Sequence, residues 1–363
     1  MCCLAYYTFQ ESIDVRACTT VERQKGYAAS ICKGGERMRI ALFGGTGLVG
    51  GYLVDELINQ AHEPVLLVRP GSEPRVRHGG QCVTVTGDVT DPGSVRRTLE
   101  GCEAAIYNIG ILREFPRKGI TFEQLQFQSA RCSIDAAGEL GVRRFVLMSP
   151  NGARQDGTPY QRTKFQAEQH LCSSKLDYTI LRPSIIFGDP RGRMEICTQL
   201  RDQMIRLPLP APLFYEGLLP LKSGSFALSP IHVTDVARII IKSLAMPATV
   251  GQTFTLCGPE AIEWRAIIRL IAKACGTFKL TVPVPAFYIR ILATLLESYE
   301  FFPVTRDQLT MLLEGNTGDS SDVYKLFDID PIHFTEAALS YLQGTGARPN
   351  EPSQTPARHA RPR

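Results

Sequence analysis

The sequence lacks three features that would assign it to common classes of protein. Its 363 residues hold no apolar run near the roughly 20 residues that a membrane-spanning helix needs, which predicts a soluble or peripheral protein. The eleven cysteines include no C-x-x-C pair, which favours reduced thiols in the cytoplasm over a disulfide framework or a metal site. The formal net charge is only +4 without a concentrated basic face, so we expect no nucleic-acid partner.

The two ends of the chain differ from the rest. Residues 1–37 carry acidic side chains and lack the apolar centre of a signal peptide, so they resemble neither a transit peptide nor a signal peptide. A strand-like run begins directly after Met38, and we hypothesise that translation starts there and that 1–37 is a wrongly assigned or disordered extension. Residues 344–363 are rich in Gly, Pro, Arg and Ser, which predicts disorder.

The stretch from Ile40 to Gly50 is the most informative part of the sequence. A short apolar run enters a loop with three glycines, and an apolar segment with helical spacing follows. This pattern predicts a buried strand, a tight turn and a helix N-terminus, where free N–H groups and the helix dipole attract a pyrophosphate. The residues expected to contact a dinucleotide here are Gly44, Thr46, Gly47, Leu48, Val49 and Gly50.

Strand and helix patterns then alternate along the chain. We expect strands at 40–43, 64–69, 81–88, 104–108, 144–149 and 178–182, and a helix at 122–140. Such alternation is typical of an α/β, Rossmann-type doubly wound parallel sheet, because parallel strands need crossover helices. We expect a nucleotide-binding domain at 38–188, to which 228–256 returns, and a smaller C-terminal α/β lobe for substrate or partner at 189–343.

Cofactor-binding groups gather where parallel strands end. Arg69 ends the second strand and is either an ordinary surface residue or a ligand for a ribose 2′-phosphate; no acidic residue comes before Glu73, which favours NADP(H) over NAD(H). Asp88 and Val89 either frame the adenine or begin the next helix, and we favour the adenine. The later strand ends supply Asn108, Gly110, Ser149 and Pro183.

Tyr160 and Lys164 form a second chemical signal. Four residues apart on a helix, they lie on one face, where an ammonium lowers the pKa of a phenol and prepares it for proton transfer. The same lysine can hydrogen-bond a nicotinamide ribose. The Y-x-x-x-K pattern often arises by chance, but its position after the fifth strand favours function.

Taken together, these motifs resemble a known family. Five motifs carry the general resemblance: 44–50, 88–89, 160–164, 181–183 and 233–237. They are similar to the motifs of extended or atypical short-chain dehydrogenases/reductases of the NAD-dependent epimerase/dehydratase superfamily. Three further segments, 107–112, 179–188 and 302–309, resemble proteins related to the 39 kDa accessory subunit of respiratory complex I. The resemblance extends from about Met38 to Gln343.

The resemblance implies that the cofactor lies along the glycine turn and that a Ser/Thr–Tyr–Lys trio handles the proton of hydride transfer. On this chain the trio is Ser149, Tyr160 and Lys164, although Pro150 stands where active epimerases have a further Ser or Thr. Members near the complex I subunit keep the nucleotide tightly as a structural element. Two hypotheses follow: a structural NAD(P)(H) binder linked to quinone, respiratory or lipid metabolism, peripheral to the inner membrane, or an active NADP(H)-dependent reductase or epimerase.

The C-terminal third contains two segments without an assigned role. Residues 206–215 form a proline-studded apolar loop, either a lid over an apolar substrate or a loop packed on the core, which we favour. Residues 286–302 are apolar and rich in aromatic side chains. We expect a core helix there, with docking on a protein partner or a membrane surface as the alternative.

Overall fold

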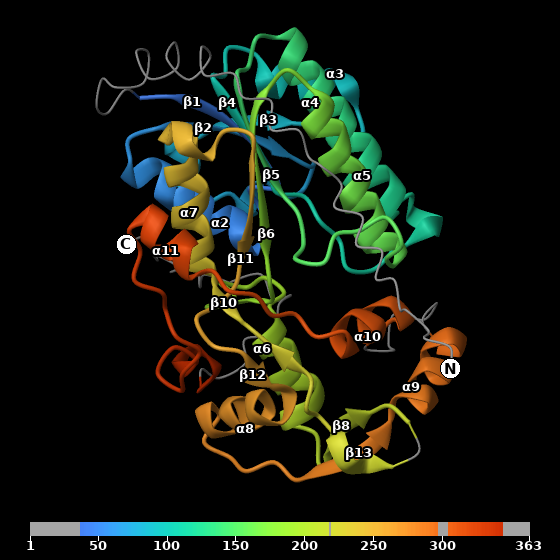
Figure 1. Cartoon of the computed structure of the whole chain (residues 1–363). Helices are drawn as coiled ribbons and strands as arrows, with labels where there is room; N and C mark the ends of the chain where they lie inside the picture. Colours follow the sequence, from blue (N-terminus) through green and yellow to red (C-terminus); the bar gives the residue numbers. More distant parts are fainter. Residues whose placement is uncertain (1–36, 218, 297–303, 344–363) are drawn as a thin grey trace, which may run out of the picture. The chain divides into compact units, whose positions relative to one another are not determined.

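The structure, a computed structural model, describes residues 37–217, 219–296 and 304–343 (Figure 1). The predictions for residues 1–36 and 344–363 therefore lie outside the described residues. The described chain begins just before the first strand, and its central element is a parallel sheet with helices on both sides.

That sheet has seven strands in the order β11-β6-β5-β4-β1-β2-β3, and every neighbouring pair is parallel. The strands are β1 (Arg39–Phe43), β2 (Glu63–Val68), β3 (Val83–Thr86), β4 (Ala104–Tyr107), β5 (Arg144–Met148), β6 (Asp177–Pro183) and β11 (Gln252–Leu256). The order reverses between β1 and β4, as in a doubly wound sheet. The predicted fold class is confirmed, and the strand ends differ from the predicted ones by one or two residues.

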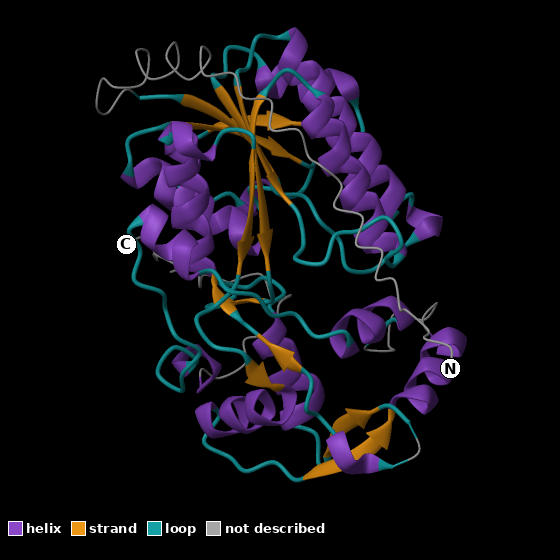
Figure 2. Cartoon of the chain, in the orientation of Figure 1, coloured by secondary structure: helices purple, strands orange, loops and turns teal. Residues whose placement is uncertain are grey.

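Helices bury both faces of the sheet (Figure 2). On one face, Ile40 and Leu42 pack with α2 (Leu48–Asn59), α7 (Val233–Ala245) and α11 (Ser321–Phe327). On the other, Ala41 and Phe43 pack with α3 (Pro92–Leu99), α4 (Ser129–Glu139) and α5 (Pro159–Ser173). Because successive residues of a strand point to opposite faces, a strand covered on both sides is apolar throughout, which explains the uninterrupted run in β1.

The predicted helix at 122–140 consists of two parts. A π-helical segment, Glu123–Gln128, precedes α4. The wider turn is accompanied by two side-chain contacts: Gln126, which is fully buried, donates from Nε2 to the carbonyl of Ile111 at 2.7 Å, and Ser129 donates from Oγ to the carbonyl of Gln124 at 2.8 Å. π-Helical turns occur often at functional sites. This one borders the loop that follows β4.

The C-terminal lobe is built from short strand pairs and helices around Trp264 and Leu309, which are buried. The pairs are β7 (Ile186–Phe187) with β10 (Ile231–His232), β9 (Ala227–Leu228) with β12 (Ile262–Glu263), and β8 (Ala211–Tyr215) with β13 (Thr281–Pro285). The helices are α6 (Ile196–Leu200), α8 (Trp264–Ala274), α9 (Ala286–Leu296) and α10 (Arg306–Leu313).

Two expectations about this lobe hold only in part. Residues 211–215 are strand β8, with Ala211 and Phe214 in the core, whereas Leu207 and Leu209 before it are exposed. α9 buries one face through small side chains such as Ala293 and exposes large apolar ones on the other. The prediction of a core helix is therefore wrong for the outer face of α9, and residues 297–302 lie outside the described residues.

Within the described ranges, none of the helices is long and apolar enough to cross a membrane. The same residues contain no group of three or more His, Cys, Asp or Glu side chains placed to hold a metal ion. The cysteines that the structure describes are free thiols.

Candidate functional site

The turn between β1 and α2 has the shape that a pyrophosphate requires. Gly44 has a φ of +93°, which L residues with a side chain rarely adopt. Gly47 caps α2 without any side-chain hydrogen bond to the first turn, so the N–H groups of Leu48 and Val49 have no side-chain cap. A Cβ on Gly50 would lie 2.1 Å from the carbonyl oxygen of Gly44, so only glycine lets the helix approach the turn this closely. Thr46, half-buried, lies between these glycines.

The loop after β4 forms the neighbouring wall. The N–H of Asn108 donates to the carbonyl of Phe43 at 3.0 Å, and a Cβ on Gly44 would lie 2.9 Å from the Asn108 carbonyl oxygen. The side-chain Oδ1 of Asn108 is buried and has no hydrogen-bond partner in the described part of the chain. A buried polar atom without a partner is costly and is typical of a group that binds a ligand.

Lys164 reaches the same wall from α5. Its side chain is buried, and its Nζ donates to the carbonyls of Ile109 at 2.7 Å and Met148 at 3.0 Å. Gly110 lies beside it, with its Cβ position 3.6 Å from Nζ. Burial lowers the pKa of Lys164 to about 8, against the opposing charge of Glu168 one turn later. An ammonium has three donors, so one remains after these two bonds.

Tyr160 lies one turn before Lys164 and does not behave as predicted. Its ring makes an edge-to-face contact with Phe122, with the ring centroids 5.7 Å apart. Burial raises the pKa of Tyr160 to about 12. The predicted lowering of this pKa is wrong for this structure, because burial of the phenol disfavours its charged form. Near neutral pH the phenol keeps its proton and can donate it, but cannot readily accept one.

Ser149 directly follows β5 and is 2 % exposed, and its hydroxyl has no hydrogen-bond partner among the described residues. Asn151, two residues later, donates from Nδ2 to Oδ1 of Asn316 at 2.7 Å and to the carbonyl of Thr317 at 3.2 Å. Its N–H donates to the carbonyl of Pro183, the last residue of β6. The side chain of Asn151 therefore holds this loop against residues 316–317. The side chain of Ser149, in contrast, makes no hydrogen bond with the described residues.

Arg69 and Asp88 lie at the ends of β2 and β3. Arg69 is exposed, and its side chain forms no hydrogen bond or ion pair with the described residues. Asp88 accepts from the N–H and the hydroxyl of Thr90 at 2.9 and 2.8 Å, which closes a local turn next to the buried Val89. The N-cap of the following helix is Asp91, so the alternative role of Asp88 as that cap is wrong.

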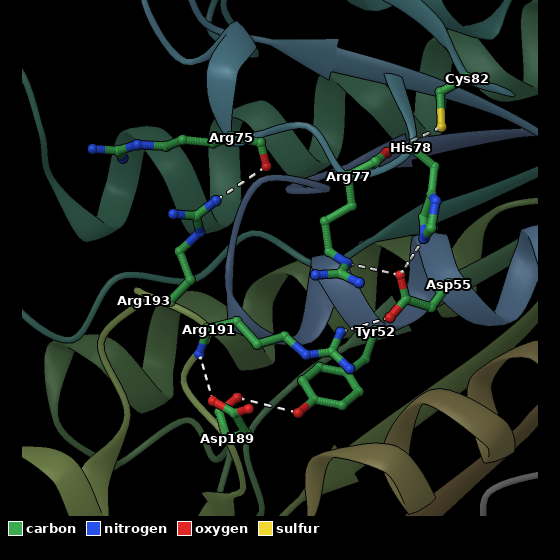
Figure 3. Close-up of polar contacts among 9 residues, drawn as sticks. All are labelled: Tyr52, Asp55, Arg75, Arg77, His78, Cys82, Asp189, Arg191 and Arg193. Atoms are coloured by element: carbon green, nitrogen blue, oxygen red, sulfur yellow. Dashed lines mark hydrogen bonds and ion pairs between the residues drawn. The ribbon is translucent and has the colours of Figure 1, made fainter. Parts of the chain in front are cut away.

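Figure 3 shows a polar cluster that sequence reasoning missed. Asp55 of α2 accepts hydrogen bonds from Arg77 at 2.8 Å and Arg191 at 2.6 Å, and His78 lies 3.1 Å away. The guanidinium of Arg191 also stacks 3.6 Å from the ring centroid of Tyr52. Burial would raise the pKa of Asp55, but the bonds from the two arginines hold it below its usual value. The cluster ties α2 to the loops after β2 and β7.

A second tie joins the start of α5 to the segment after α10. Glu314 accepts from Arg154 at 2.6 Å and from Nε2 of Gln161 at 3.1 Å, and Gln161 also closes the capping box of α5 with Thr158. Asn151 binds the same segment through Asn316. Sequence reasoning had no signal for this contact, because the partners are about 150 residues or more apart in the chain.

Comparison with known proteins supports a nucleotide-binding domain. The sequence model of a family described as NAD(P)H-binding matches residues 44–205, which contain the glycine turn, the strand ends and the Tyr160–Lys164 helix described above. This part of the chain therefore carries an NAD(P)H-binding domain with a Rossmann-type parallel sheet.

The chain is similar to a photosystem II assembly factor and to a subunit of NADH-ubiquinone oxidoreductase. It is 24% identical over 312 residues to the photosystem II assembly factor Ycf39 of Synechocystis sp., covering 84% of this chain and 90% of that one. It is 24% identical over 311 residues to the mitochondrial NADH-ubiquinone oxidoreductase 40 kDa subunit of Neurospora crassa, covering 83% and 78%. The resemblance to the complex I 39 kDa type is thereby confirmed.

Solved structures agree on the fold. The epimerase Mth375 from Methanothermobacter thermautotrophicus superposes with a TM-score of 0.65 at 15% identity, over 89% of this chain and 94% of that one. MoeE5 in complex with UDP-glucose and NAD superposes with a TM-score of 0.61 at 16% identity, over 84% and 97%. At these identities the likeness concerns the fold alone.

Proposed function

We propose that this protein holds NADP(H) tightly at the carboxyl edge of its sheet and uses it mainly as a structural element, as an accessory-type protein linked to quinone, respiratory or lipid metabolism. The observation that carries the proposal is the residue after Ser149: Pro150 stands where active epimerases have a further Ser or Thr, and a proline has no hydroxyl to polarise a substrate carbonyl. The raised pKa of Tyr160 and the tie through Glu314 support the same view.

The residues present fit a nicotinamide dinucleotide. The open N–H groups after Gly47 suit the pyrophosphate, and Asp88 with Val89 suits the adenosine end. Asn108 and Gly110, Ser149 and Pro183 border the nicotinamide end, where the third donor of Lys164 would reach a ribose hydroxyl. A bound nicotinamide ring would supply or accept hydride. The chain itself would orient that ring and hold a proton on Tyr160.

NADP(H) is favoured over NAD(H) by the charge of the loop after β2. In this loop Arg77 is neutralised by Asp55, whereas Arg69 and Arg75 have no carboxylate partner among the described residues. An unpaired guanidinium forms strong, charge-assisted bonds with a 2′-phosphate. Arg193 donates to the carbonyl of Arg75 at 3.0 Å and adds a further positive charge to this end of the site (Figure 3).

The alternative is an active NADP(H)-dependent reductase or epimerase. The specific observation in its favour is the Tyr160–Lys164 pair, which stands on one helix at the spacing that such enzymes use. In that case Tyr160 donates the proton that accompanies hydride transfer and Lys164 orients the ribose. The raised pKa of Tyr160 suits a proton donor better than a base.

We propose a corresponding division of the chain. Residues 38–188, with 228–256, form the nucleotide-binding part, and 189–343 form a lobe that contacts a protein partner or a membrane surface. The relatives that are subunits or assembly factors support a role in docking. We therefore propose a location in the cytoplasm or at the periphery of the inner membrane.

One experiment tests the central proposal. The protein is purified without added nucleotide, denatured, and the released nucleotide is identified and quantified; a second portion is dialysed and offered ketones and quinones. Stoichiometric NADP(H) that survives dialysis and is not consumed supports the structural role. Reversible binding with oxidation of NADPH by a carbonyl or quinone supports the enzyme instead. A protein that binds neither NADPH nor NADH when they are added would overturn both.

A further inference from the structure

Helix α9 presents apolar side chains to solvent along its outer face. Ala286 and Ala293 are buried against the lobe. The side chains on the outer face are 43–67 % exposed: Phe287, Tyr288, Ile291, Leu292 and Leu295. A surface helix of a globular protein normally exposes polar residues to solvent, whereas α9 exposes mainly apolar ones. The outer face of α9 is therefore an exposed apolar surface.

Exposed apolar residues are concentrated in this lobe. Of the sixteen large apolar side chains that are exposed in the described part of the chain, twelve lie between Leu207 and Leu295. Leu219 and Leu221, at 65 and 83 % exposure, flank Pro220 in a short turn that packs on β8 and β13. α9 directly follows β13 and packs against it. Exposed apolar side chains concentrated on elements that pack on the same strand are typical of an interaction site.

Basic side chains outnumber acidic ones along this part of the chain, and Asp202, the acidic residue just before it, forms an ion pair with Arg206 at 3.1 Å. The segments 206–225 and 276–296 contain Arg206, Lys222, Lys279 and Arg290 but one acidic residue, Glu216. Glu216 accepts a hydrogen bond from Arg290 at 2.7 Å. A groove of about 300 Å³ runs beside the exposed stripe, lined by Ile291, Leu295 and two arginines, Arg290 and Arg306. Apolar side chains bordered by basic ones match the acyl chains and phosphate groups of anionic lipids.

The sequence beyond Gln343 is also basic. Residues 344–363 contain four arginines and a single acidic residue, Glu351. Stable attachment to a bilayer usually requires two signals, such as an apolar face and a basic segment. The chain carries both.

We propose that the outer face of α9, together with Leu219 and Leu221, is a membrane-binding surface that recognises anionic phospholipid bilayers. Phe287, Ile291 and Leu295 insert at the level of the headgroups, and the surrounding cations contact lipid phosphates. This deepens the partner assignment proposed above and does not depend on whether the nucleotide turns over.

Co-sedimentation of the full chain with vesicles tests the proposal, using phosphatidylcholine alone and phosphatidylcholine mixed with phosphatidylglycerol. We expect binding to the mixed vesicles, weakened by salt, and little binding to phosphatidylcholine alone. The double variant Ile291→Ser/Leu295→Ser should bind at least about tenfold more weakly, since both side chains then lose their apolar burial. Leu326→Ser, which changes a leucine on α11 that is 39 % exposed and lies outside this surface, is the control and should bind as the natural protein does.

Three results would overturn the proposal. The natural protein binds no vesicle, or the double variant binds as well as the control. Alternatively, sedimentation velocity shows a dimer that the double variant converts to a monomer, which would make this face an interface between two copies. Nucleotide content and circular dichroism are measured on the same samples, so a folding defect or a failure of the nucleotide proposal is seen separately.

Discussion

The Nζ of Lys164 lies 2.7 Å from the carbonyl oxygen of Ile109, and this bond joins the helix after β5 to the loop after β4. A second bond, to the carbonyl of Met148, fixes the ammonium between two strand ends. The lysine is thus part of the protein's own hydrogen-bond network before any nucleotide is considered. Two of its three N–H groups stabilise the fold, and the third can donate a hydrogen bond to a ribose hydroxyl.

The titration of Lys164 predicts how nucleotide binding depends on pH. Burial lowers the pKa of this ammonium to about 8, and contact with ribose and phosphate oxygens would raise it again in the complex. Binding then takes up a proton above about pH 8, so nucleotide affinity should fall as pH rises, by at most about tenfold per pH unit. Calorimetric titrations across this range check it. Lys164→Met should remove the slope; a slope that persists in this variant would show that another group is responsible.

Tyr160→Phe separates the structural role from the catalytic one. The ring contact with Phe122 is retained. We therefore expect the nucleotide content to stay the same and the free energy of unfolding to change by less than about 0.5 kcal/mol. Tyr107→Phe is the matched control, because its hydroxyl donates to the carbonyl of Leu125 at 2.6 Å and its loss should cost about 1 kcal/mol. Denaturant unfolding and nucleotide release measure both. Loss of a measurable turnover in Tyr160→Phe with its cofactor still bound would favour the enzyme.

Arg69→Ala tests the choice of cofactor. If the guanidinium binds a 2′-phosphate, its removal should weaken NADPH binding by about 1.5–3 kcal/mol, roughly ten- to a hundredfold, and leave NADH binding unchanged. Fluorescence titration with both nucleotides gives the ratio. Arg143→Ala, an exposed arginine that precedes β5 at the opposite edge of the sheet, should change neither affinity. Equal losses of NADPH and NADH affinity in Arg69→Ala would mean that this arginine does not bind the 2′-phosphate.

Gly50→Ala tests the glycine turn. The new Cβ would lie 2.1 Å from the carbonyl oxygen of Gly44, so the turn must open; we expect loss of nucleotide binding and about 1–3 kcal/mol of stability. Gly138→Ala in α4 is the control, because its Cβ meets nothing within 4 Å. That variant should gain about 0.5–1 kcal/mol from reduced backbone entropy. Normal nucleotide binding by Gly50→Ala would contradict the assignment of the turn.

Glu314→Ala tests the tie that holds the start of α5. Without this carboxylate, Arg154 and Gln161 lose an acceptor, and we expect faster hydrogen exchange at residues 151–161 with the nucleotide retained. Glu336→Ala, which breaks a surface ion pair with Lys273, should leave these residues unchanged. Mass spectrometry of exchanged peptides distinguishes the two. Unchanged exchange in Glu314→Ala would show that the tie does not hold this loop.

The sequence by itself determined the sheet and the glycine turn. The apolar run of β1, the glycines at 44 and 50 and the helical spacing after them are local features, and local sterics dictate the structure they form. The spacing of Tyr160 and Lys164 likewise placed both on one helix. The strand ends that border the candidate site followed from the same alternation.

Only the tertiary structure decided the environment of these residues. The carbonyls that bind Lys164, the burial that raises the pKa of Tyr160, and the ties through Asp55 and Glu314 all join segments that are distant in sequence. The outward apolar face of α9 is of the same kind, because a pattern shows that a helix is apolar but not which of its faces meets the core. Long-range packing sets burial, and burial sets both the charge states and the surface that a partner meets.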